Sequence, residues 1–467
     1  MKNSIIKNLT ICIIWIGLWT IVSLIVDNMI LLPSPMDTIR ALSSLGGDTE
    51  FYVDILATIM RCGLSIIIAF ALGCLVAYGS YSKQWLRSFF SLPVAFFKAV
   101  PVMAIIIYLI LLANSAVVPI IVAFLMCFPI VYTNVLTGLD SIDSKLLEMG
   151  SVFNLSRRKT MRFITIPSVL PQIKASLSLI AGLSWKAVVT AEVLSIPKFS
   201  LGYKMMDAKY YLETPNLFAY ILVIVCLSIA FERLIKKAVN TIDIKSYQKS
   251  KTAKYADTYT NKEAKAVENT VKSPKDDIKV RNFTKTFEDG KTVVFPDRIF
   301  EKGRTSVIMA PSGTGKTTLL RAIAGLTEYG GQITGFKDQA DGVAMIFQEN
   351  RLIPWLNVYD NLAIVMQGLT KDEIKEKVLP IIEGLSLTDA MYKLPHELSG
   401  GMQHRVAIGR ALIFPSGLLL VDEPFRGLDE ELKLAIIHGI WKEKTAGKTI
   451  IVATHNPGDE KELLKEY

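Results

Sequence analysis

The stretch "APSGTGKTTLL" (residues 310–320) decides how the second half of this chain folds. It follows the apolar run "TSVIMA" (305–310) and precedes a helical pattern, so we expect a strand, a tight loop and then a helix at Lys316–Ala324. Gly313 and Gly315 allow the backbone to curl until its amide hydrogens point at a phosphate, at the positive end of the helix dipole. The stretch therefore predicts a phosphate-binding loop (P-loop).

One residue departs from the usual pattern of such loops, because Ala310 stands where they commonly begin with glycine. It lies at the strand end, upstream of the tightest curl, so one methyl group is tolerated there if the φ angle is negative. Lys316 is expected to reach the β- and γ-phosphates, and Thr317 to coordinate Mg²⁺. The other loop residues expected to hold the nucleotide are Ser312, Gly313, Thr314, Gly315 and Thr318.

The residues around this loop have the composition and alternating pattern of a soluble α/β domain. Short β-rich runs alternate with helical stretches; besides the run before the loop they are "GVAMIF" (342–347), "GLLLVD" (417–422) and "TIIVAT" (449–454). Continuously apolar strands are typical of a sheet covered on both faces. We therefore predict an α/β P-loop domain over 277–467, preceded by a polar, flexible linker over 240–276 that lacks apolar periodicity.

The first half of the chain is of a different kind. Hydrophobic residues make up 51% of the sequence and charged residues only 20%, and the apolar content is concentrated before the linker. Runs long enough to cross a bilayer need roughly 20 residues. Six candidates lie near 9–26, 55–79, 88–112, 116–137, 169–194 and 217–235. We predict an α-helical six-span domain over 1–239, embedded in membrane lipid, with its cysteines buried and reduced.

The charges between these runs predict an orientation. Lysines and arginines gather at the ends of the runs, for example Arg157, Arg158 and Lys159 between the fourth and the fifth, whereas the loop after the first run is acidic. Because cytoplasmic flanks of membrane helices are basic, both ends of the membrane domain and the P-loop domain are expected in the cytoplasm. The net charge of +9 is explained in the same way, and we expect no nucleic-acid binding.

Further landmarks follow the P-loop in a fixed order: "LSGGMQ" (398–403), "GLLLVDEPF" (417–425) and "VATH" (452–455). Asp422 ends an apolar run and is expected to hold Mg²⁺ through water. Glu423 follows directly and is the expected general base, or polariser, for an attacking water. A carboxylate aimed at a triphosphate needs the metal ion to offset their repulsion.

With these landmarks in this order, the chain resembles the ATP-binding cassette (ABC) transporters over nearly its full length. The signature "LSGGM" separates that family from other P-loop ATPases, and here methionine replaces the common glutamine. The resemblance implies ATP as the nucleotide, with Gln348 sensing the γ-phosphate and Mg²⁺, and His455 donating a hydrogen bond to the γ-phosphate. It also implies that Ser399, Gly400 and Gly401 act on the nucleotide of a second copy, so that the site is complete only in a homodimer.

For several residues near the site, the sequence leaves more than one role open. Asp429 in "RGLD" fits the loop that links two such sites, although Arg426 and Gly427 depart from the usual small residues there. Phe287 is a candidate for stacking on adenine, as in this family, and the alternative is a core strand residue. The histidines without a motif, read as ordinary surface or helix residues, are His396, His404 and His438.

One loop of the membrane half indicates the direction of transport. The stretch "LLEMGSVFNLSRRKTMRFITIPSVLPQI" (146–173) resembles the cytoplasmic loop of importer permeases, with Glu148 at its start and Asn154 at a position that is usually glycine. Asparagine tolerates a left-handed turn better than other non-glycine residues. We expect a short amphipathic helix here, lying in a groove of the ATPase domain near Gln348.

Two more stretches, "LLPSPMDTIRAL" (31–42) and one over 185–211, look like permeases for nitrate, taurine and other sulfonates; "FQENRLIPWLNVYDNL" (347–362) is similar to their ATPases. The sequence therefore predicts half of a homodimeric importer in the cell membrane, served by an extracytoplasmic binding protein. The solute would be a sulfonate, a nitrate-like anion or a vitamin precursor. The alternatives are an exporter half, for which the loops are short, and a membrane-anchored regulatory ATPase.

Polar residues inside the apolar runs are the natural places to seek a solute site. The candidates are Arg61 in the second run and Lys186 and Glu192 in the fifth. Lys186 and Glu192 are six residues apart, so they do not lie on one face of a helix. For all three, a role in helix packing or in lining a gate is favoured over contact with the solute.

Overall fold

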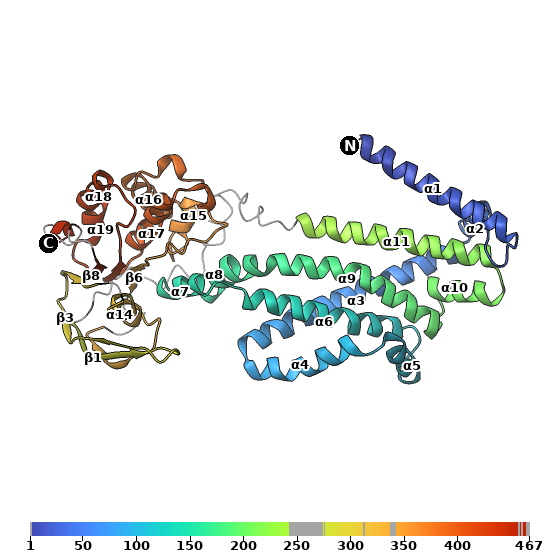
Figure 1. Cartoon of the computed structure of the whole chain (residues 1–467), viewed down its shortest axis with the longest axis horizontal. Helices are drawn as coiled ribbons and strands as arrows, with labels where there is room; N and C mark the ends of the chain where they lie inside the picture. Colours follow the sequence, from blue (N-terminus) through green and yellow to red (C-terminus); the bar gives the residue numbers. More distant parts are fainter. Residues whose placement is uncertain are drawn as a thin grey trace. The chain divides into compact units, whose positions relative to one another are not determined.

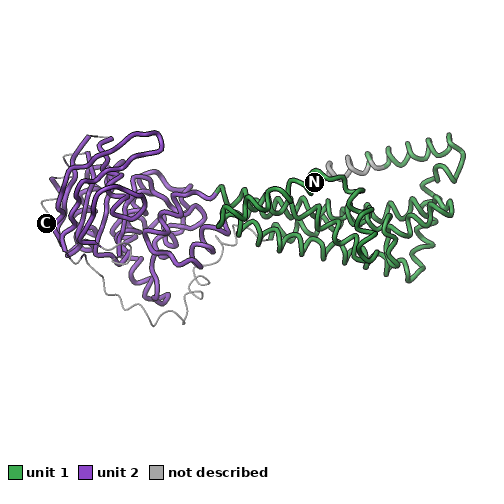
Figure 2. The backbone as a smooth tube through the Cα atoms, turned by 90° about the horizontal axis from the view of Figure 1, so that it is seen from below, with its two compact units in different colours: residues 1–141, 168–242 green, residues 142–167, 243–467 purple. Residues whose placement is uncertain are grey.

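The computed structural model describes residues 2–241, 274, 276–311, 313–336, 342–455, 458 and 461–463. These residues form two compact units, which Figure 2 distinguishes by colour. The first comprises residues 1–141 with 168–242, and the second comprises residues 142–167 with 243–467. Most of the expected linker, as well as Ser312 of the P-loop, lies outside the described residues.

The first unit is helical throughout its described part, and Figure 1 shows α3 and α6 running side by side. Four helical runs are long and apolar enough to cross a bilayer: α3 (Thr49–Ser82), α6 (Val118–Asp140), a run over Arg157–Ser195 that ends in α9 (Ile166–Ser195), and α11 (Thr214–Thr241). In α1 (Lys2–Val26) the corresponding apolar helix is shorter, covering Ile13–Val26. The shorter helices α2 (Pro35–Leu45) and α10 (Leu201–Tyr210) also belong to this unit.

The third expected span is not one straight helix. Residues 88–112 fall on α4 (Gln84–Ala99) and α5 (Val102–Leu112), which meet at an angle of 104°. Val100 and Pro101 between them have extended backbone, with ψ angles of 132° and 128°. The proline ring disfavours a helical residue before it, which explains the break. The described residues thus support four spans, or five if the bent pair counts as one, against the six expected.

The core of the membrane unit explains why α3 and α6 lie so close together. A Cβ atom at Gly73 of α3 would come within 2.7 Å of Val131 Cγ1 on α6, so only glycine permits this approach. Cys62 and Cys127 are buried free thiols, as expected, and Cys74 is half-buried. Cys226 is exposed on α11, so the expectation that every cysteine is buried was wrong for this residue.

The second unit contains the expected α/β arrangement. Its central sheet is parallel, in the order β4 (Thr305–Met309), β8 (Thr449–Thr454), β7 (Leu418–Asp422) and β6 (Val343–Ile346). These four strands correspond to the four apolar runs of the sequence. A second, antiparallel sheet has the order β2 (Thr292–Phe295), β1 (Ile278–Thr286) and β3 (Arg298–Phe300), with β5 (Gly330–Thr334) also paired to β1. Every residue of β7 and β8 is buried, which confirms a sheet covered on both faces.

The helices of this unit carry the sequence landmarks. Among the described residues they include α14 (Lys316–Ile323), α15 (Val358–Ala363), α16 (Lys371–Gly384), α17 (Gly400–Ile413), α18 (Glu430–Ile436), the π-helical turn η5 (Ile437–Trp441) and α19 (Lys442–Thr445). Met309 pairs with Thr454, and Asp422 pairs with Ala453, at the carboxyl ends of parallel strands. The P-loop, Asp422 and His455 therefore meet at one edge of the sheet, where ligands of such folds bind.

The importer-like stretch contributes its first part to the second unit. It begins with α7 (Ser144–Val152), whose first turn is capped by the Asp143 carboxylate, and continues through α8 (Arg157–Thr160) into the π-helical turn η1 (Met161–Thr165). Asn154, which lies between α7 and α8, has a φ angle of 49°. This is the left-handed region, so the prediction that asparagine replaces glycine at a left-handed turn is confirmed.

Candidate nucleotide site

The P-loop has the backbone that its glycines predict. Gly313 and Gly315 have φ angles of 86° and 91°, and Gly315 caps the N-terminus of α14. A Cβ atom at Gly315 would lie 2.2 Å from Val293 Cγ1, so both the φ angle and the space exclude a side chain. Ala310 is not among the described residues with positive φ, so its methyl group meets the condition set by the sequence.

Lys316 closes the loop from inside. Its largely buried ammonium donates to the carbonyl oxygens of Ala310 and Pro311, the latter at 3.1 Å. The Thr314 hydroxyl also donates to the Pro311 carbonyl, at 2.9 Å. These carbonyl oxygens place the ammonium group of Lys316 within the curl of the loop, at the N-terminus of α14, where a phosphate would bind.

A cleft of about 350 Å³ opens over the loop. It is lined by Phe287, Lys291, Val293, Gly313, Gly315, Lys316, Thr317, Thr318, Gln348, Asp422 and Glu423. Phe287 follows β1 and is 40% exposed, so the alternative reading as a core strand residue was wrong. An exposed ring at the mouth of a cleft is available for stacking on a base.

At the floor of the cleft a buried carboxylate faces a hydroxyl. Burial raises the pKa of the Asp422 carboxyl above its ordinary value, although a hydrogen bond with the Thr317 side chain opposes this. Asp422 Oδ2 is buried without a hydrogen-bond partner in the described part of the chain. An orphaned carboxylate oxygen next to a threonine hydroxyl fits a hard cation such as Mg²⁺.

No group of three or more acidic, histidine or cysteine residues that could hold a metal by itself occurs among the described residues. Mg²⁺ is usually bound by one or two carboxylates together with water and substrate phosphates. The donor set here, Thr317 and Asp422 with Gln348 on the wall of the cleft, agrees with that pattern.

Three of the expected catalytic residues lie together. Gln348 Nε2 donates to Glu423 Oε2 at 3.3 Å, and His455 Nδ1 lies 2.9 Å from Glu423 Oε1. Arg426, which the sequence singled out only as a departure from pattern, places its guanidinium 3.8 Å from the same carboxylate. Glu423 has a φ angle of 51°, in the left-handed region, and its amide donates to the Ala453 carbonyl at 2.9 Å.

The signature residues lie away from the lining of this cleft. Ser399 caps α17, where its hydroxyl accepts from the Met402 amide at 3.3 Å, and Gly400 is the first residue of that helix. Asp429 caps α18 in the same manner, accepting from the Leu432 amide at 2.8 Å. In the described part of one chain these residues therefore do not line the cleft over the P-loop.

Sequence reasoning missed the partners of Glu148. This carboxylate of α7 accepts from both terminal nitrogens of Arg321, at 2.8 and 2.9 Å, and from Arg351 Nη1 at 2.6 Å. Burial tends to raise the pKa of Glu148, but the hydrogen bonds from the two guanidinium groups outweigh it and hold the pKa below its ordinary value. Arg321 lies on the helix that begins with Lys316, and Arg351 lies three residues after Gln348.

The rest of the segment over residues 142–167 is held by further polar contacts. Lys145 pairs with Glu349 at 2.7 Å, and Trp355 Nε1 donates to the Phe163 carbonyl at 2.8 Å. Lys159 Nζ donates to the carbonyls of Ile364 and Met366, at 3.1 and 2.8 Å. The prediction that this stretch contacts the ATPase domain is thus confirmed, whereas the groove near Gln348 stays a prediction.

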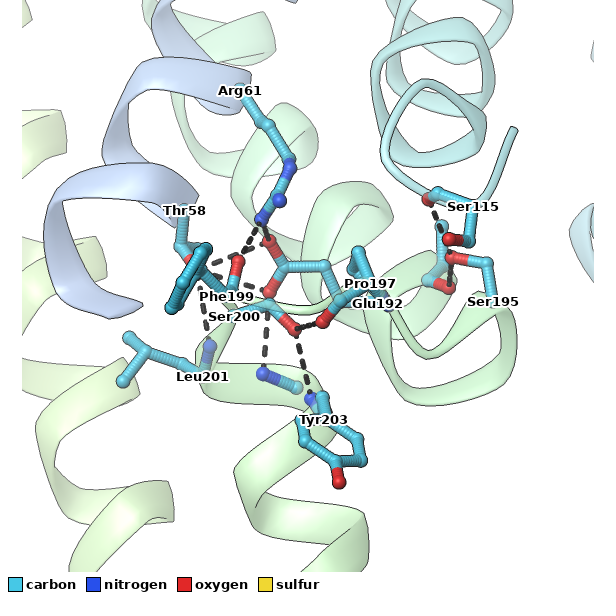
Figure 3. Close-up of polar contacts among 12 residues, drawn as sticks. Thr58, Arg61, Ser115, Glu192, Ser195, Pro197, Phe199, Ser200, Leu201 and Tyr203 are labelled. Atoms are coloured by element: carbon cyan, nitrogen blue, oxygen red, sulfur yellow. Dashed lines mark hydrogen bonds and ion pairs between the residues drawn. The ribbon is translucent and has the colours of Figure 1, made fainter. Parts of the chain in front are cut away.

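Figure 3 shows the polar cluster inside the membrane unit, within which lie two of the three intramembrane candidates. Arg61 Nη1 donates to Glu192 Oε1 at 2.6 Å and to the Phe199 carbonyl at 2.8 Å. Glu192 is fully buried and also accepts from the Thr58 hydroxyl and the Gly202 amide. The charges of Arg61 and Glu192 thus satisfy each other and tie α3, α9 and the start of α10 together, which agrees with a role in packing.

Comparison with known proteins identifies the family of each half of the chain. The family described as "ABC transporter" matches residues 298–426, and the family described as "Binding-protein-dependent transport system inner membrane component" matches residues 69–239. The chain therefore belongs to the ABC transporter family. It joins an importer-type permease domain and an ATPase domain in one polypeptide, and it is a membrane protein.

The similar proteins include import ATP-binding proteins. The Aliphatic sulfonates import ATP-binding protein SsuB of Bacillus licheniformis is 39% identical over 191 residues, which cover 38% of this chain and 74% of that protein. The sn-glycerol-3-phosphate import ATP-binding protein UgpC of Rhodopseudomonas palustris is 35% identical over 192 residues, which cover 38% of this chain and 53% of that protein. A dimeric structure of a bacterial ABC transporter cassette aligns with a TM-score of 0.36 and 27% identity, covering 40% of this chain and 90% of that chain.

Proposed function

We propose that this chain is half of an ATP-driven importer. Two copies would form the working transporter, receive a small solute from an extracytoplasmic binding protein and move it into the cytoplasm. One permease domain and one ATPase domain per chain require two copies, because each P-loop needs the signature residues of the other copy. The main observation behind the proposal is that Arg321 and Arg351 form ion pairs with Glu148 of the importer-like segment.

The residues of the cleft suggest the chemistry. Lys316 would exchange its carbonyl partners for the phosphates of ATP, Thr317 and Asp422 would hold Mg²⁺, and Phe287 would stack on adenine. When bound, Mg²⁺ offsets the charge of the phosphates. Glu423 would accept a proton from the attacking water, which requires that its present partners Gln348 and His455 turn toward the phosphate side.

The same contacts suggest how hydrolysis is coupled to transport. Arg321 follows the P-loop on α14 and Arg351 follows Gln348, so Glu148 is bound by both walls of the nucleotide cleft. A change in the distance between these walls on ATP binding would act directly on residues 142–167. This route favours an importer over an exporter or a regulatory ATPase, because it runs through the importer-like loop.

The solute is proposed only as a class: a sulfonate, a nitrate-like anion or a vitamin precursor. The relatives named above are ATP-binding proteins that match 38% of this chain, so their names do not identify its solute. Since Arg61 is paired with Glu192, this guanidinium is not a free cation for an anionic solute. We also propose domain boundaries of 1–239, 240–276 and 277–467, with the ATPase domain in the cytoplasm.

The experiment is a pull-down of the tagged Glu423→Gln variant with ATP and Mg²⁺ from membranes of its own cell. This variant should bind ATP but hydrolyse it slowly, and so accumulate the closed dimer. Co-purification of an extracytoplasmic binding protein, identified by mass spectrometry, would support import, and its ligand would name the solute. Recovery of the dimer alone, while wild type hydrolyses ATP, would count against import.

A further inference from the structure

His404 has no role in the function proposed above, yet its surroundings are unusual for a histidine without a motif. It lies in the first half of α17, five residues after Ser399, and is 4% exposed. Its Nε2 is 2.6 Å from the Pro424 carbonyl oxygen, and its Nδ1 is 2.8 Å from the side-chain oxygen Oδ1 of Asn350. The His404 ring therefore connects α17, which begins with the signature residues, to Pro424 directly after Glu423 and to Asn350 in the loop after Gln348.

The chemistry of these partners fixes the tautomer. A carbonyl oxygen only accepts, so Nε2 must carry the hydrogen and donate it to Pro424. Burial lowers the pKa of His404 and the positive charge of Arg426 adds to this, although the Pro424 hydrogen bond opposes them. The ring is therefore neutral near pH 7, its Nδ1 is an acceptor, and Asn350 must turn its NH₂ group toward it.

The two segments joined by this ring are both conformationally strained. Glu423 and Arg351 have φ angles of 51° and 45°, which only glycine adopts without cost. Such a backbone persists only where neighbours hold it. Besides His404, the fully buried Arg410 of α17 donates to the carbonyls of Asn350 and Arg351, at 3.0 and 2.8 Å.

We propose that His404 is a positioning residue for ATP hydrolysis. It fixes the turn that aims the Glu423 carboxylate and locks this turn to the loop that carries Gln348 and Arg351. Because Arg351 in turn binds Glu148, the ring also joins the catalytic carboxylate to the segment over residues 142–167. The inference rests on the proposed role of Glu423 as general base, but not on the solute or on the direction of transport.

The test measures ATP hydrolysis by the full-length protein in lipid nanodiscs. In His404→Ala, kcat should fall by roughly tenfold to a hundredfold, because misplacing a catalytic group by about 1 Å costs up to about a hundredfold. KM for ATP should change less than about twofold, since Lys316 and Thr317 are untouched. His404→Gln should recover most of kcat, because its amide can donate to Pro424 and accept from Asn350. His438→Ala, a half-exposed histidine of the same unit, is the control and should behave as wild type.

A second variant separates positioning from mere packing. In Asn350→Asp the new carboxylate can only accept, so it should place a proton on Nδ1 and raise the pKa of His404 against the field of Arg426. The pH profile of kcat should then gain a step that disappears in the double variant Asn350→Asp/His404→Gln.

Three results would overturn the inference. The first is an unchanged kcat in His404→Ala, and the second is equal loss in His404→Ala and His404→Gln when both melt like wild type. The third is full activity of Glu423→Gln, which would remove the general base itself and with it the need to position it. Failure of the import proposal would leave all of these ATPase measurements as expected.

Discussion

The replacement of Gly315 by alanine separates two reasons for a glycine in the P-loop. The first is the φ angle of 91°, which costs a side chain about 1–2 kcal/mol, or roughly 5- to 30-fold in an equilibrium constant. The second is space, because the new Cβ atom would lie 2.2 Å from Val293 Cγ1, whereas ordinary contacts begin at 3.4 Å. We expect Gly315→Ala to displace β2 or the loop and to abolish ATP binding.

The double variant Gly315→Ala/Val293→Ala removes the atom that the new methyl group would meet. Only the φ cost then remains, so binding of a fluorescent ATP analogue should return to within roughly 5- to 30-fold of wild type. Gly313→Ala is the matched control in the nucleotide-free protein, since its φ angle is 86° but no described atom lies within 4 Å of its Cβ. Its melting temperature should fall less than that of Gly315→Ala. Equal binding by the single and double variants would refute this reasoning.

Three further predictions concern charges. Glu192→Met leaves the largely buried guanidinium of Arg61 without its carboxylate partner and should cost about 3–5 kcal/mol, whereas Arg61→Met/Glu192→Met should melt closer to wild type in detergent. Burial raises the pKa of Asp360 to about 6, so the folded state favours the protonated carboxyl and loses stability as pH rises through this value. At about pH 8, the free energy of unfolding of Asp360→Asn should therefore exceed that of wild type by up to about 3 kcal/mol, as denaturant titration would show. Below about pH 4 the two proteins should be equally stable. Asp422→Asn should still bind ATP in the presence of EDTA but lose the Mg²⁺-dependent part of binding, as titrations with and without the metal would reveal.

The parts of the site that follow one another along the chain could be predicted from the sequence. The P-loop, Asp422 and Glu423 each follow a continuously apolar strand, and neighbouring parallel strands bring their ends to one edge. The contacts of Glu148 could not be predicted in this way, because Arg321 and Arg351 are 173 and 203 positions away. Nothing in a single sequence indicates which of many arginines reaches one carboxylate.

The broken span shows a different limit. Pro101 ends α4 and begins α5 at 104°, but Pro93, Pro129 and Pro171 lie inside continuous helices. A proline in an apolar run therefore marks a possible break without deciding it, since neighbouring helices can satisfy the carbonyl that it leaves unpaired. His404 shows the same limit for the site: its type and position in "LSGGMQH" do not reveal that it is buried between two strained turns.

The assignment of residues 142–167 to the second unit bears on what the fusion of the two domains achieves. If the chain were cut once within 243–273, the N-terminal fragment would still carry Glu148, Lys145 and Lys159, and these would still hold the ATPase fragment. The nicked protein would be an ordinary two-chain transporter. Covalent connection thus mainly keeps the two parts in equal number and raises the concentration of each part near the other.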